Sequence, residues 1–325
     1  MSNVLDQPVR PAGVPSGPGP RPGRRPRRER RARPAGQRTL VSPHQMRTRG
    51  GRIAYWSVLT FVLVLFTLVF VFPLYWMVTG ALKSSGELAQ LPPTLFPKDP
   101  HPEVYKTAWN QMDLGRYIFN SFVYALGAWL LQLAVDVSAA YALSKLRPMF
   151  GKLILGGMLL TLMIPPTVLL LPAYLTVRDL PIFHLNLLNT PWAIWLPAAA
   201  NGFNIFLLKR FFDSIPTELL EAAAIDGASS VRILWSIVLP VSRPIIGVVS
   251  IFAVVNVWKD FVWPLLVMPD TGKMPVSVAI TQLSQQLPQN VLIAALVIAS
   301  LPAVVVFFVF QRNIMAGLTA GGLKG

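Results

Sequence analysis

Long apolar stretches, separated by short polar or proline-containing segments, dominate the chain after residue 53. A helix needs about 20 mostly apolar residues to cross a membrane, and six stretches meet this requirement. They cover residues 54–81, 117–143, 153–175, 190–208, 244–267 and 290–311. The first contains no charged residue, and the second contains only Asp136. The pattern predicts an all-α, polytopic membrane protein with six transmembrane helices.

Prolines occur inside several of these stretches. Membrane helices tolerate proline when neighbouring groups satisfy the backbone carbonyls that it leaves free. We therefore expect kinks or helix ends at Pro73, Pro165, Pro166, Pro197, Pro264 and Pro302.

The composition agrees with a membrane protein and excludes several kinds of chemistry. Of the 325 residues, 53% are hydrophobic and 13% charged, whereas soluble domains carry about 25% charged residues. The chain has no cysteine, which excludes disulfides, thiolate metal sites and cysteine catalysis. Three scattered histidines and the absence of a phosphate-binding loop predict no metal site and no bound nucleotide.

The N-terminal segment differs from the rest of the chain in composition. Residues 1–52 are rich in Pro and Gly and hold thirteen arginines, against only Asp6 and Glu29 as acids. Such a segment cannot bury a core, so we expect a disordered basic tail on the cytoplasmic side. Contact with anionic lipid headgroups is the favoured interpretation of its charge, ahead of binding to nucleic acid.

The distribution of Lys and Arg predicts the orientation of the helices. If the N-terminus is cytoplasmic, 22 of these residues lie in cytoplasmic segments and six lie outside. Cytoplasmic loops carry the excess of positive charge, so both termini are predicted inside. Counting the spans then places the polar segment of residues 209–243 on the cytoplasmic face.

This polar segment, which we call the elbow, carries helix signals on both sides of a glycine. Ser214 is a candidate cap for a helix over Pro216–Asp226. Gly227 stands where a left-handed residue ends a helix, and Ser229 or Ser230 can cap a second short helix. The elbow is therefore predicted as two short helices outside the membrane that dock on a partner.

The elbow resembles the EAA loop of ABC-importer permeases. The matching residues are Glu221-Ala222-Ala223, Gly227 and Ile237-Val238-Leu239-Pro240. The stretches FPLYWMVTGALKSS (72–85), AAYALSKLR (139–147), MIPPTVLLLPAYL (163–175), WKDFVWPLLV (258–267) and GLTAGGLKG (317–325) resemble the second permease of maltose-type carbohydrate importers. The resemblance covers most of residues 53–325, implies the type I permease fold, and leaves out the tail.

By this resemblance the chain is expected to be a bacterial cell-membrane permease subunit for a sugar or oligosaccharide. It would work with a second permease, a dimer of cytoplasmic ATPases that use ATP and Mg²⁺, and an extracytoplasmic binding protein. It would bind no cofactor and catalyse no reaction itself. The residues implied in coupling to the ATPase are Glu221, Ala222, Ala223, Asp226, Gly227, Leu239 and Pro240 in the elbow, and Gly317, Gly321 and Lys324 in the C-terminal tail.

Polar and aromatic residues of the later spans are candidates for the substrate path. Sugars bind to aromatic faces and to amides that reach their hydroxyls, within mainly apolar sites. The candidates are Asn201, Asn204, Asn256, Trp258, Asp260 and Trp263. Lys259 departs from the Asn that the family commonly has, which leaves open an interface charge pair or a contact with substrate. For Asp136 we favour a polar contact between helices or subunits over a role in proton coupling.

Three other functions are compatible with parts of the pattern. A permease for peptides, polyamines or another small solute belongs to the same class. An ion-coupled secondary transporter would need inverted repeats and charges near the membrane midplane, which this pattern does not suggest. A membrane scaffold would act through its arginine tail, so deletion of residues 1–48 would separate it from a permease.

Overall fold

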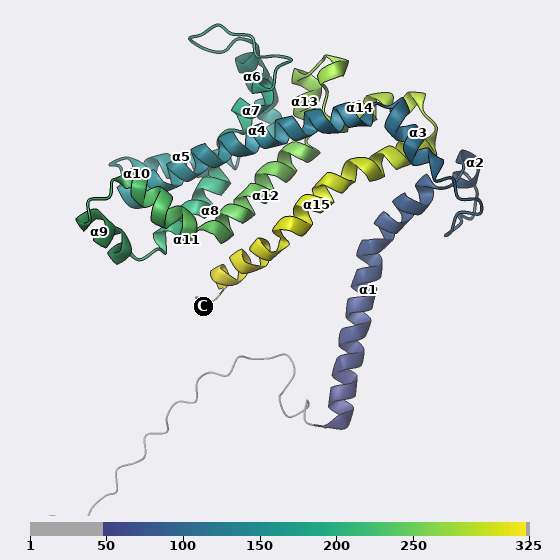
Figure 1. The fold of residues 1–325 in the computed structure, drawn as a ribbon, viewed down its shortest axis with the longest axis horizontal. Helices are drawn as coiled ribbons and strands as arrows, with labels where there is room; N and C mark the ends of the chain where they lie inside the picture. Colours follow the sequence, from purple (N-terminus) through teal and green to yellow (C-terminus); the bar gives the residue numbers. More distant parts are fainter. Residues whose placement is uncertain (1–47, 323–325) are drawn as a thin grey trace, which may run out of the picture. The chain divides into compact units, whose positions relative to one another are not determined.

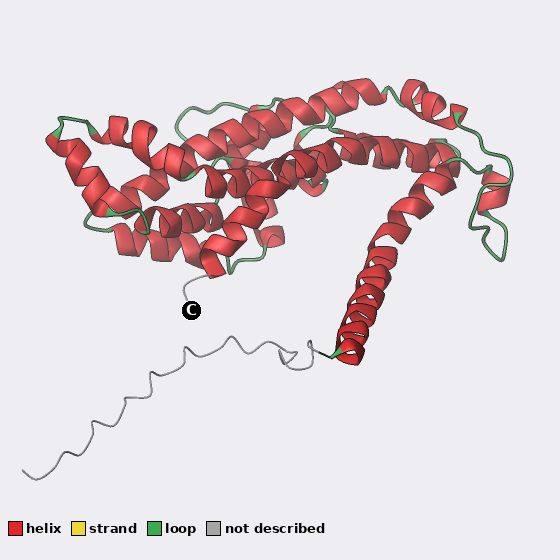
Figure 2. Ribbon diagram, turned by 60° about the horizontal axis from the view of Figure 1, so that its bottom comes forward, coloured by secondary structure: helices red, strands yellow, loops and turns green. Residues whose placement is uncertain are grey.

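The computed structural model describes residues 48–322, with side chains up to Gln311. The predicted tail over residues 1–52 therefore lies almost wholly outside the described residues, and so does Lys324. The chain divides into two units, residues 1–66 and 67–325, and helix α1 (Arg49–Ala81) begins in the first and ends in the second. Every element of the described part is helical apart from one isolated bridge between Leu180 and Leu185, as Figure 2 shows.

The second unit is built on α4 (Leu114–Tyr141), which continues into a π-helical turn, η2 (Ala142–Leu146). Its neighbours α8 (Gly202–Asp213), α12 (Arg243–Lys259) and α15 (Gln289–Gly322) pack against it or against each other. Figure 1 shows α4, α12 and α15 running side by side through this unit. Small residues permit the close approach: Ala125, Ala128 and Ala140 of α4 are all buried.

Shorter helices complete the second unit. They include α2 (Ser85–Leu88), α3 (Glu103–Gln111), α13 (Val262–Val267), η4 (Thr271–Lys273), α14 (Val276–Leu283) and η5 (Ser284–Gln286). The other helices outside the elbow are α5 (Gly151–Thr161), α6 (Pro166–Arg178) and α7 (Trp192–Ala198).

Three predicted spans are broken rather than continuous helices. Within residues 153–175, α5 and α6 meet at an angle of 107° just before Pro166. Within 190–208, α7 ends at Ala198 and α8 begins at Gly202. Within residues 244–267, α12 ends at Lys259 and α13 begins at Val262. Each break lies close to a proline, because proline has no N–H to continue the hydrogen-bond ladder and its ring clashes with the preceding turn.

Counted by length and composition, the described residues hold three helices able to cross a membrane, or up to five if each bent pair is one span. The three are α1, α4 with η2, and α15 up to Gln311. The second bent pair joins residues 230–241 to α12 at 85°. The all-α class is confirmed in the described residues, whereas the count of six spans remains a prediction.

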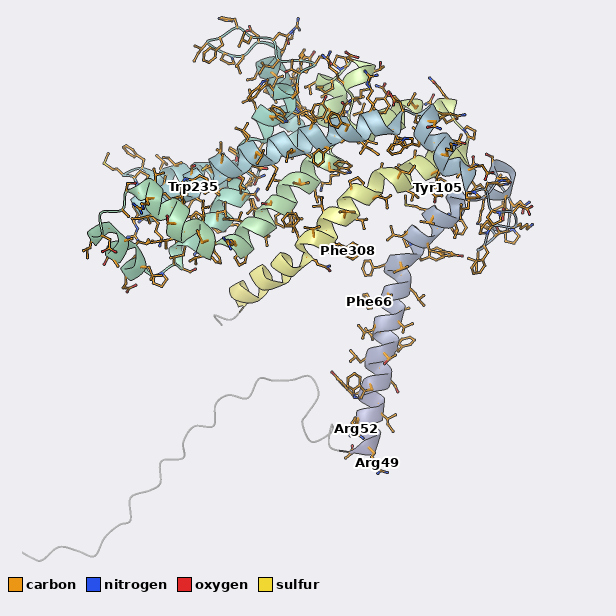
Figure 3. The ribbon with its side chains drawn as sticks, viewed as in Figure 1. Arg49, Arg52, Phe66, Tyr105, Trp235 and Phe308 are labelled. Atoms are coloured by element: carbon orange, nitrogen blue, oxygen red, sulfur yellow. The ribbon has the colours of Figure 1, made fainter. Side chains whose placement is uncertain are left out.

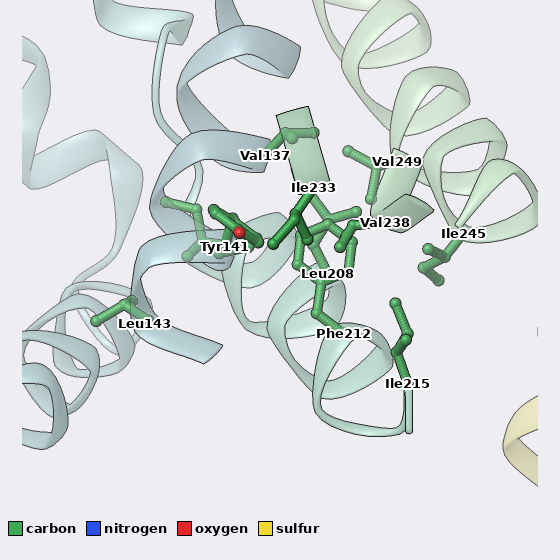
Figure 4. Packing of buried hydrophobic residues seen from close by; sticks show 12 residues of the cluster. Val137, Tyr141, Leu143, Leu208, Phe212, Ile215, Ile233, Val238, Ile245 and Val249 are labelled. Carbon is green, nitrogen blue, oxygen red and sulfur yellow. The ribbon is translucent and has the colours of Figure 1, made fainter. Parts of the chain in front are cut away.

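The largest apolar cluster of the second unit lies where α4, α8 and α12 meet the elbow. Val137 and Tyr141 of α4 pack with Leu208 and Phe212 of α8, as Figure 4 shows. The other labelled residues are Leu143, Ile215, Ile233, Val238, Ile245 and Val249. The elbow is thus an extension of the core.

Candidate functional site

Helix α9 (Thr217–Ile225) lies wholly within the elbow, and backbone hydrogen bonds define the C-terminal end of α9. Ala228 N donates to Ala223 O at 2.9 Å, and Gly227 N donates to Ala224 O at 3.0 Å. This pair of bonds is the Schellman arrangement, which needs a left-handed residue after the helix. Gly227 supplies it with φ of +80°, so its predicted conformation is confirmed.

The second half of the elbow continues from Ser229, whose side chain accepts from Arg232 N at 3.3 Å. Three short helical pieces follow: α10 (Ser230–Ile233), the π-helical turn η3 (Leu234–Val238) and α11 (Leu239–Val241). The predicted cap at Ser229 is confirmed. The helical path runs through Pro240 and ends at Val241, where the chain bends into α12.

The predicted cap at Ser214 is wrong. Ser214 follows the last residue of α8, and its hydroxyl donates to Phe211 O at 2.7 Å. Helix α9 begins without a side-chain cap, directly after Pro216. The N-cap position is therefore Pro216, two residues after the predicted serine.

The two faces of α9 differ in what they contact. Ala223 and Leu220 pack against the apolar cluster beneath, whereas Glu221, Ala222 and Asp226 are exposed. The elbow therefore presents a carboxylate and a small side chain outward while its inner face is held in the core. Leu239 is half-buried against the same cluster, and Pro240 is exposed.

Large apolar side chains also face outward on the elbow, and they are not among the site residues predicted from the sequence. Ile225, Val231 and Trp235 have exposed fractions of 86%, 65% and 68%, and Figure 3 labels Trp235. Exposed apolar residues clustered on one element mark interaction surfaces. Ile225 and Val231 lie on either side of the turn at Gly227. Apolar residues on both sides of a glycine that ends a helix are therefore the sequence signal that could have predicted this exposed apolar surface.

Polar ties fasten the elbow to the end of α4. Tyr141 donates its hydroxyl hydrogen to Ser230 O at 3.0 Å, and Lys145 Nζ donates to Ile215 O at 2.9 Å. Asp213, the last residue of α8, accepts from Ser144 Oγ at 2.7 Å. Between η2 and α9 lies a hollow of about 330 Å³ whose lining includes Glu221. A displacement of the elbow would therefore be felt directly by α4 and α8.

The electrostatics of Asp213 favour its charged form. Burial alone would raise the pKa of this carboxyl group. Hydrogen bonds from Lys209 and Ser144, together with the positive charges of Lys209 and Lys145, outweigh burial and lower the pKa below its ordinary value.

Asn201 and Asn204, two candidates for the substrate path, lie together at the break before α8. Asn201 caps α8 by accepting from Asn204 N at 3.1 Å, and Asn204 is 3% exposed. Asn201 N also donates to Oδ1 of the fully buried Asp136 at 2.9 Å. The predicted contact of Asp136 between helices is therefore confirmed, and it joins α4 to α8. Among the described residues, its Oδ2 has no hydrogen-bond partner.

The other path candidates lie on or just after α12, in different surroundings. Trp258 donates its indole N–H to Ala299 O at 3.3 Å, and Trp263 donates to Ala193 O at 2.9 Å. Trp258 also lines an apolar groove of about 430 Å³ between α4, α12 and α15. Asn256 is exposed on α12, and Asp260 follows that helix with its backbone carbonyl accepting from Ser277 Oγ at 2.7 Å. The six candidates thus do not form one cluster.

The predicted coupling residues of the C-terminal tail are beyond the described side chains. Gly317 and Gly321 fall in the final turns of α15, and Lys324 lies outside the described residues. In the part of the chain with described side chains, no group of three or more metal-ligating residues is close enough to hold a metal ion.

Comparison with known proteins identifies relatives over most of the chain. Residues 133–319 match the family described as the binding-protein-dependent transport system inner membrane component. The sulfoquinovosyl glycerol transport system permease protein SmoH of Agrobacterium fabrum is 35% identical over 258 residues, which cover 78% of this chain and 89% of that protein. The sn-glycerol-3-phosphate transport system permease protein UgpE of Yersinia pestis (strain Antiqua) is 31% identical, with coverages of 79% and 93%.

A solved structure has the same fold. It is the crystal structure of a bacterial ABC transporter involved in the import of the acidic polysaccharide alginate, with a TM-score of 0.72 and 24% identity. The match covers 82% of this chain and 98% of the other.

Proposed function

This chain belongs to the family of inner-membrane components of binding-protein-dependent transport systems, and we propose that it forms part of an ATP-driven uptake pathway for a sugar or oligosaccharide. The named cargoes of its relatives support this class. Sulfoquinovosyl glycerol contains a sugar, and sn-glycerol-3-phosphate is a related polyol phosphate. A permease for another small solute is the alternative, and a panel of radiolabelled solutes in uptake assays distinguishes the two.

The elbow is the proposed docking site for a cytoplasmic ATPase dimer. The observation that carries this proposal is a rigid turn at Gly227 that presents Glu221 and exposed apolar residues outward, on a base tied to α4 and α8. ATP and Mg²⁺ are used by the ATPase chains, and this chain hydrolyses nothing. A second permease and an extracytoplasmic binding protein complete the proposed assembly in the bacterial cell membrane.

Transport would follow from movement of the elbow. When the ATPases close on ATP, the docked elbow moves with them, and the ties at Tyr141, Lys145 and Asp213 pass that movement to α4 and α8. Asn201, Asn204, Asn256, Trp258, Asp260 and Trp263 remain proposed contacts for the cargo. Gly317, Gly321 and Lys324 remain proposed contacts of the C-terminal tail with the ATPase.

Two substitutions in the elbow test the docking by different physical means. Glu221→Lys reverses a charge, so loss of ATPase binding should depend on salt. Gly227→Val forces a β-branched residue into the left-handed region, which costs about 1–2 kcal/mol, and its defect should depend little on salt. Gly227→Asn is the matched control, because Asn tolerates this conformation. Apart from Gly227 and its two chain neighbours, no atom lies within 4 Å of an added Cβ, so the backbone conformation is what distinguishes the two substitutions.

The measurements are co-purification of the ATPase and cargo-stimulated ATP hydrolysis across a salt series. The proposal expects Glu221→Lys and Gly227→Val to lose both, and Gly227→Asn to keep both. Wild-type assembly and stimulation in the first two variants would show that the elbow is not the docking site.

The proposed orientation, with both termini cytoplasmic, has its own test. Because the chain has no native cysteine, single cysteines can be placed at the exposed residues Thr271 and Glu218. In intact cells an impermeant thiol reagent should label the cysteine at Thr271 and spare the one at Glu218. The reverse pattern would place the elbow outside, away from any cytoplasmic ATPase.

A further inference from the structure

The loop between α1 and α3, residues 82–102, is folded with charged side chains inside. Lys83 is 2% exposed and Glu87 is 7% exposed. Lys83 Nζ donates to Thr94 O and lies 4.6 Å from the centre of the Trp76 ring. Glu87 accepts from Thr94 Oγ1 at 2.7 Å and from Lys98 N at 3.1 Å. Both buried charges are therefore satisfied, and they hold the loop in one conformation.

The same loop exposes its large apolar side chains. Leu91, Leu95 and Phe96 have exposed fractions of 89%, 55% and 71%. Lys and Glu are almost never fully buried unless they are paired, whereas Leu and Phe are usually inside. A loop surrounded by water on all sides would have the opposite arrangement, so something apolar is expected to cover these three residues.

Contacts with α1 show where along that helix the apolar residues lie. Tyr75 donates its hydroxyl hydrogen to Leu95 O at 2.7 Å, and its ring meets the Phe96 ring edge-on with centroids 6.0 Å apart. Tyr75 precedes the last residue of α1, Ala81, by six positions, or about 9 Å along the helix axis. The loop therefore turns back beside α1 and does not project beyond its end.

The length of α1 places this level at a membrane boundary. Its apolar stretch from Ile53 to Val78 would measure about 39 Å at the rise of an α-helix, longer than the hydrocarbon core of about 30 Å. The last turns, with Tyr75 and Trp76, then reach the boundary, where aromatic side chains concentrate. Phe96, in contact with Tyr75, lies at the same level.

We propose that Leu91, Leu95 and Phe96 form a lipid anchor, which inserts this loop into the membrane leaflet at the C-terminal end of α1. Lipid acyl chains are the occupant because Leu95 and Phe96 adjoin Tyr75 of α1, whose exposed apolar residues include Phe72 and Val78, and Leu91 is exposed in the same loop. A hollow of about 300 Å³ in the same loop, lined by groups such as Gln90, Lys98 and Asp99, provides a polar region that faces water. The anchor fixes the depth of α1 and does not depend on the function of the elbow.

The test uses single cysteines at Phe96 and Leu91 carrying an environment-sensitive fluorophore. The exposed Asp99 of the same loop is the matched control position. The assembled transporter is reconstituted in nanodiscs whose lipids carry a nitroxide quencher near the headgroup or near the end of the acyl chain. A label at Leu91 leaves the contact between the Tyr75 and Phe96 rings intact. Quenching at Leu91 therefore still reports membrane depth if replacement of Phe96 disturbs the loop.

The labels at Phe96 and Leu91 should be quenched most by the shallow nitroxide, at a depth of about 5–10 Å. The label at Asp99 should be quenched much less. Equal quenching at all three positions would overturn the lipid anchor. So would protection of the Phe96 label that appears only when the binding protein or the second permease is added, because the occupant would then be protein.

Discussion

Helix α1 and the α4–η2 helix have the same length, 33 residues, yet they differ in how they are packed. None of the most apolar stretch of α1 is buried, whereas 28% of the corresponding stretch of α4 is. Between Val58 and Val78, α1 contains no Gly, Ala or Ser, whereas α4 contains nine. Small residues let helix backbones approach in a membrane, where lipid is as apolar as leucine. The less apolar helix is therefore the one that builds the fold.

The two helices also differ in buried polar groups. Ser121, Gln132 and Asp136 of α4 are all buried, and Ser121 Oγ accepts from Val276 N at 2.8 Å. Such groups hold one helix to another because an unsatisfied partner in an apolar surrounding is costly. Substitutions should therefore act through packing and polar ties on α4, and through insertion into the membrane on α1.

The largest effect is expected at Gly127, where α4 meets Trp195 of α7. A Cβ at this position would lie 2.2 Å from Trp195 Cε2, and the indole is held by its hydrogen bond to Tyr124 O at 3.2 Å. Gly127→Ala should therefore overpack the contact and cost about 1–3 kcal/mol. The measurement is the midpoint of thermal unfolding of the purified protein in detergent.

The matched controls for Gly127 are Gly156 and Gly157 of α5, which have no atom within 4 Å of an added Cβ. Gly156→Ala and Gly157→Ala should be neutral or stabilising by up to about 1 kcal/mol, because alanine is the better helix former. If all three variants unfolded at the same temperature, the tight contact of α4 would have no energetic weight.

An effect of about the same size is expected from the polar tie at Asp136. Asp136→Ala leaves the Asn201 N–H without its acceptor and should cost about 1–3 kcal/mol. Asp136→Asn keeps an acceptor oxygen and should lose less. Thermal unfolding compares both variants with Leu130→Ala, an exposed position on the same helix. Equal losses in the Ala and Asn variants would mean that the carboxylate charge, which both variants lose, matters and the hydrogen bond from Asn201 N does not.

Local signals explain which parts of the elbow could be predicted from the sequence. The left-handed glycine at Gly227 and the cap at Ser229 depend on residues within a few positions of each other, and both are confirmed. Ser214 was misassigned because the same residue type caps a helix start or bonds back to the preceding turn. Only the end of α8 at Asp213 decides between these alternatives.

Tertiary contacts explain what could not be predicted. Pro165 and Pro166 predict a kink or helix end, which the break between α5 and α6 confirms, but the length of an apolar run does not give the angle of 107°. Asn201 and Asp136 are 65 positions apart, so a sequence gives no sign that they meet. Their contact gives Asn201 a structural role, and whether Asn201 also contacts a cargo remains a prediction.

The smallest effect is expected at Asp213, which ties the end of α4 to the end of α8 by accepting from Ser144 Oγ. Burial would raise its pKa, but hydrogen bonds from Lys209 and Ser144 and the nearby positive charges lower it overall. A pKa that is lower in the folded state contributes stability above the ordinary Asp value of about 3.9, and this contribution is lost as pH falls through the lowered value. Asp213→Asn keeps an acceptor for Ser144 but removes the charge.

The Asp213 side chain is 38% exposed. Solvent screening should therefore limit the loss of folding free energy in Asp213→Asn to less than about 1 kcal/mol near neutral pH. The difference in unfolding midpoint between wild type and Asp213→Asn should shrink as pH approaches about 3, because the wild-type carboxylate is then becoming protonated. Glu218→Gln, at an exposed acid of α9, controls for the change in net charge. A difference that stayed constant down to that pH would mean that the charge of Asp213 does not hold the end of α4.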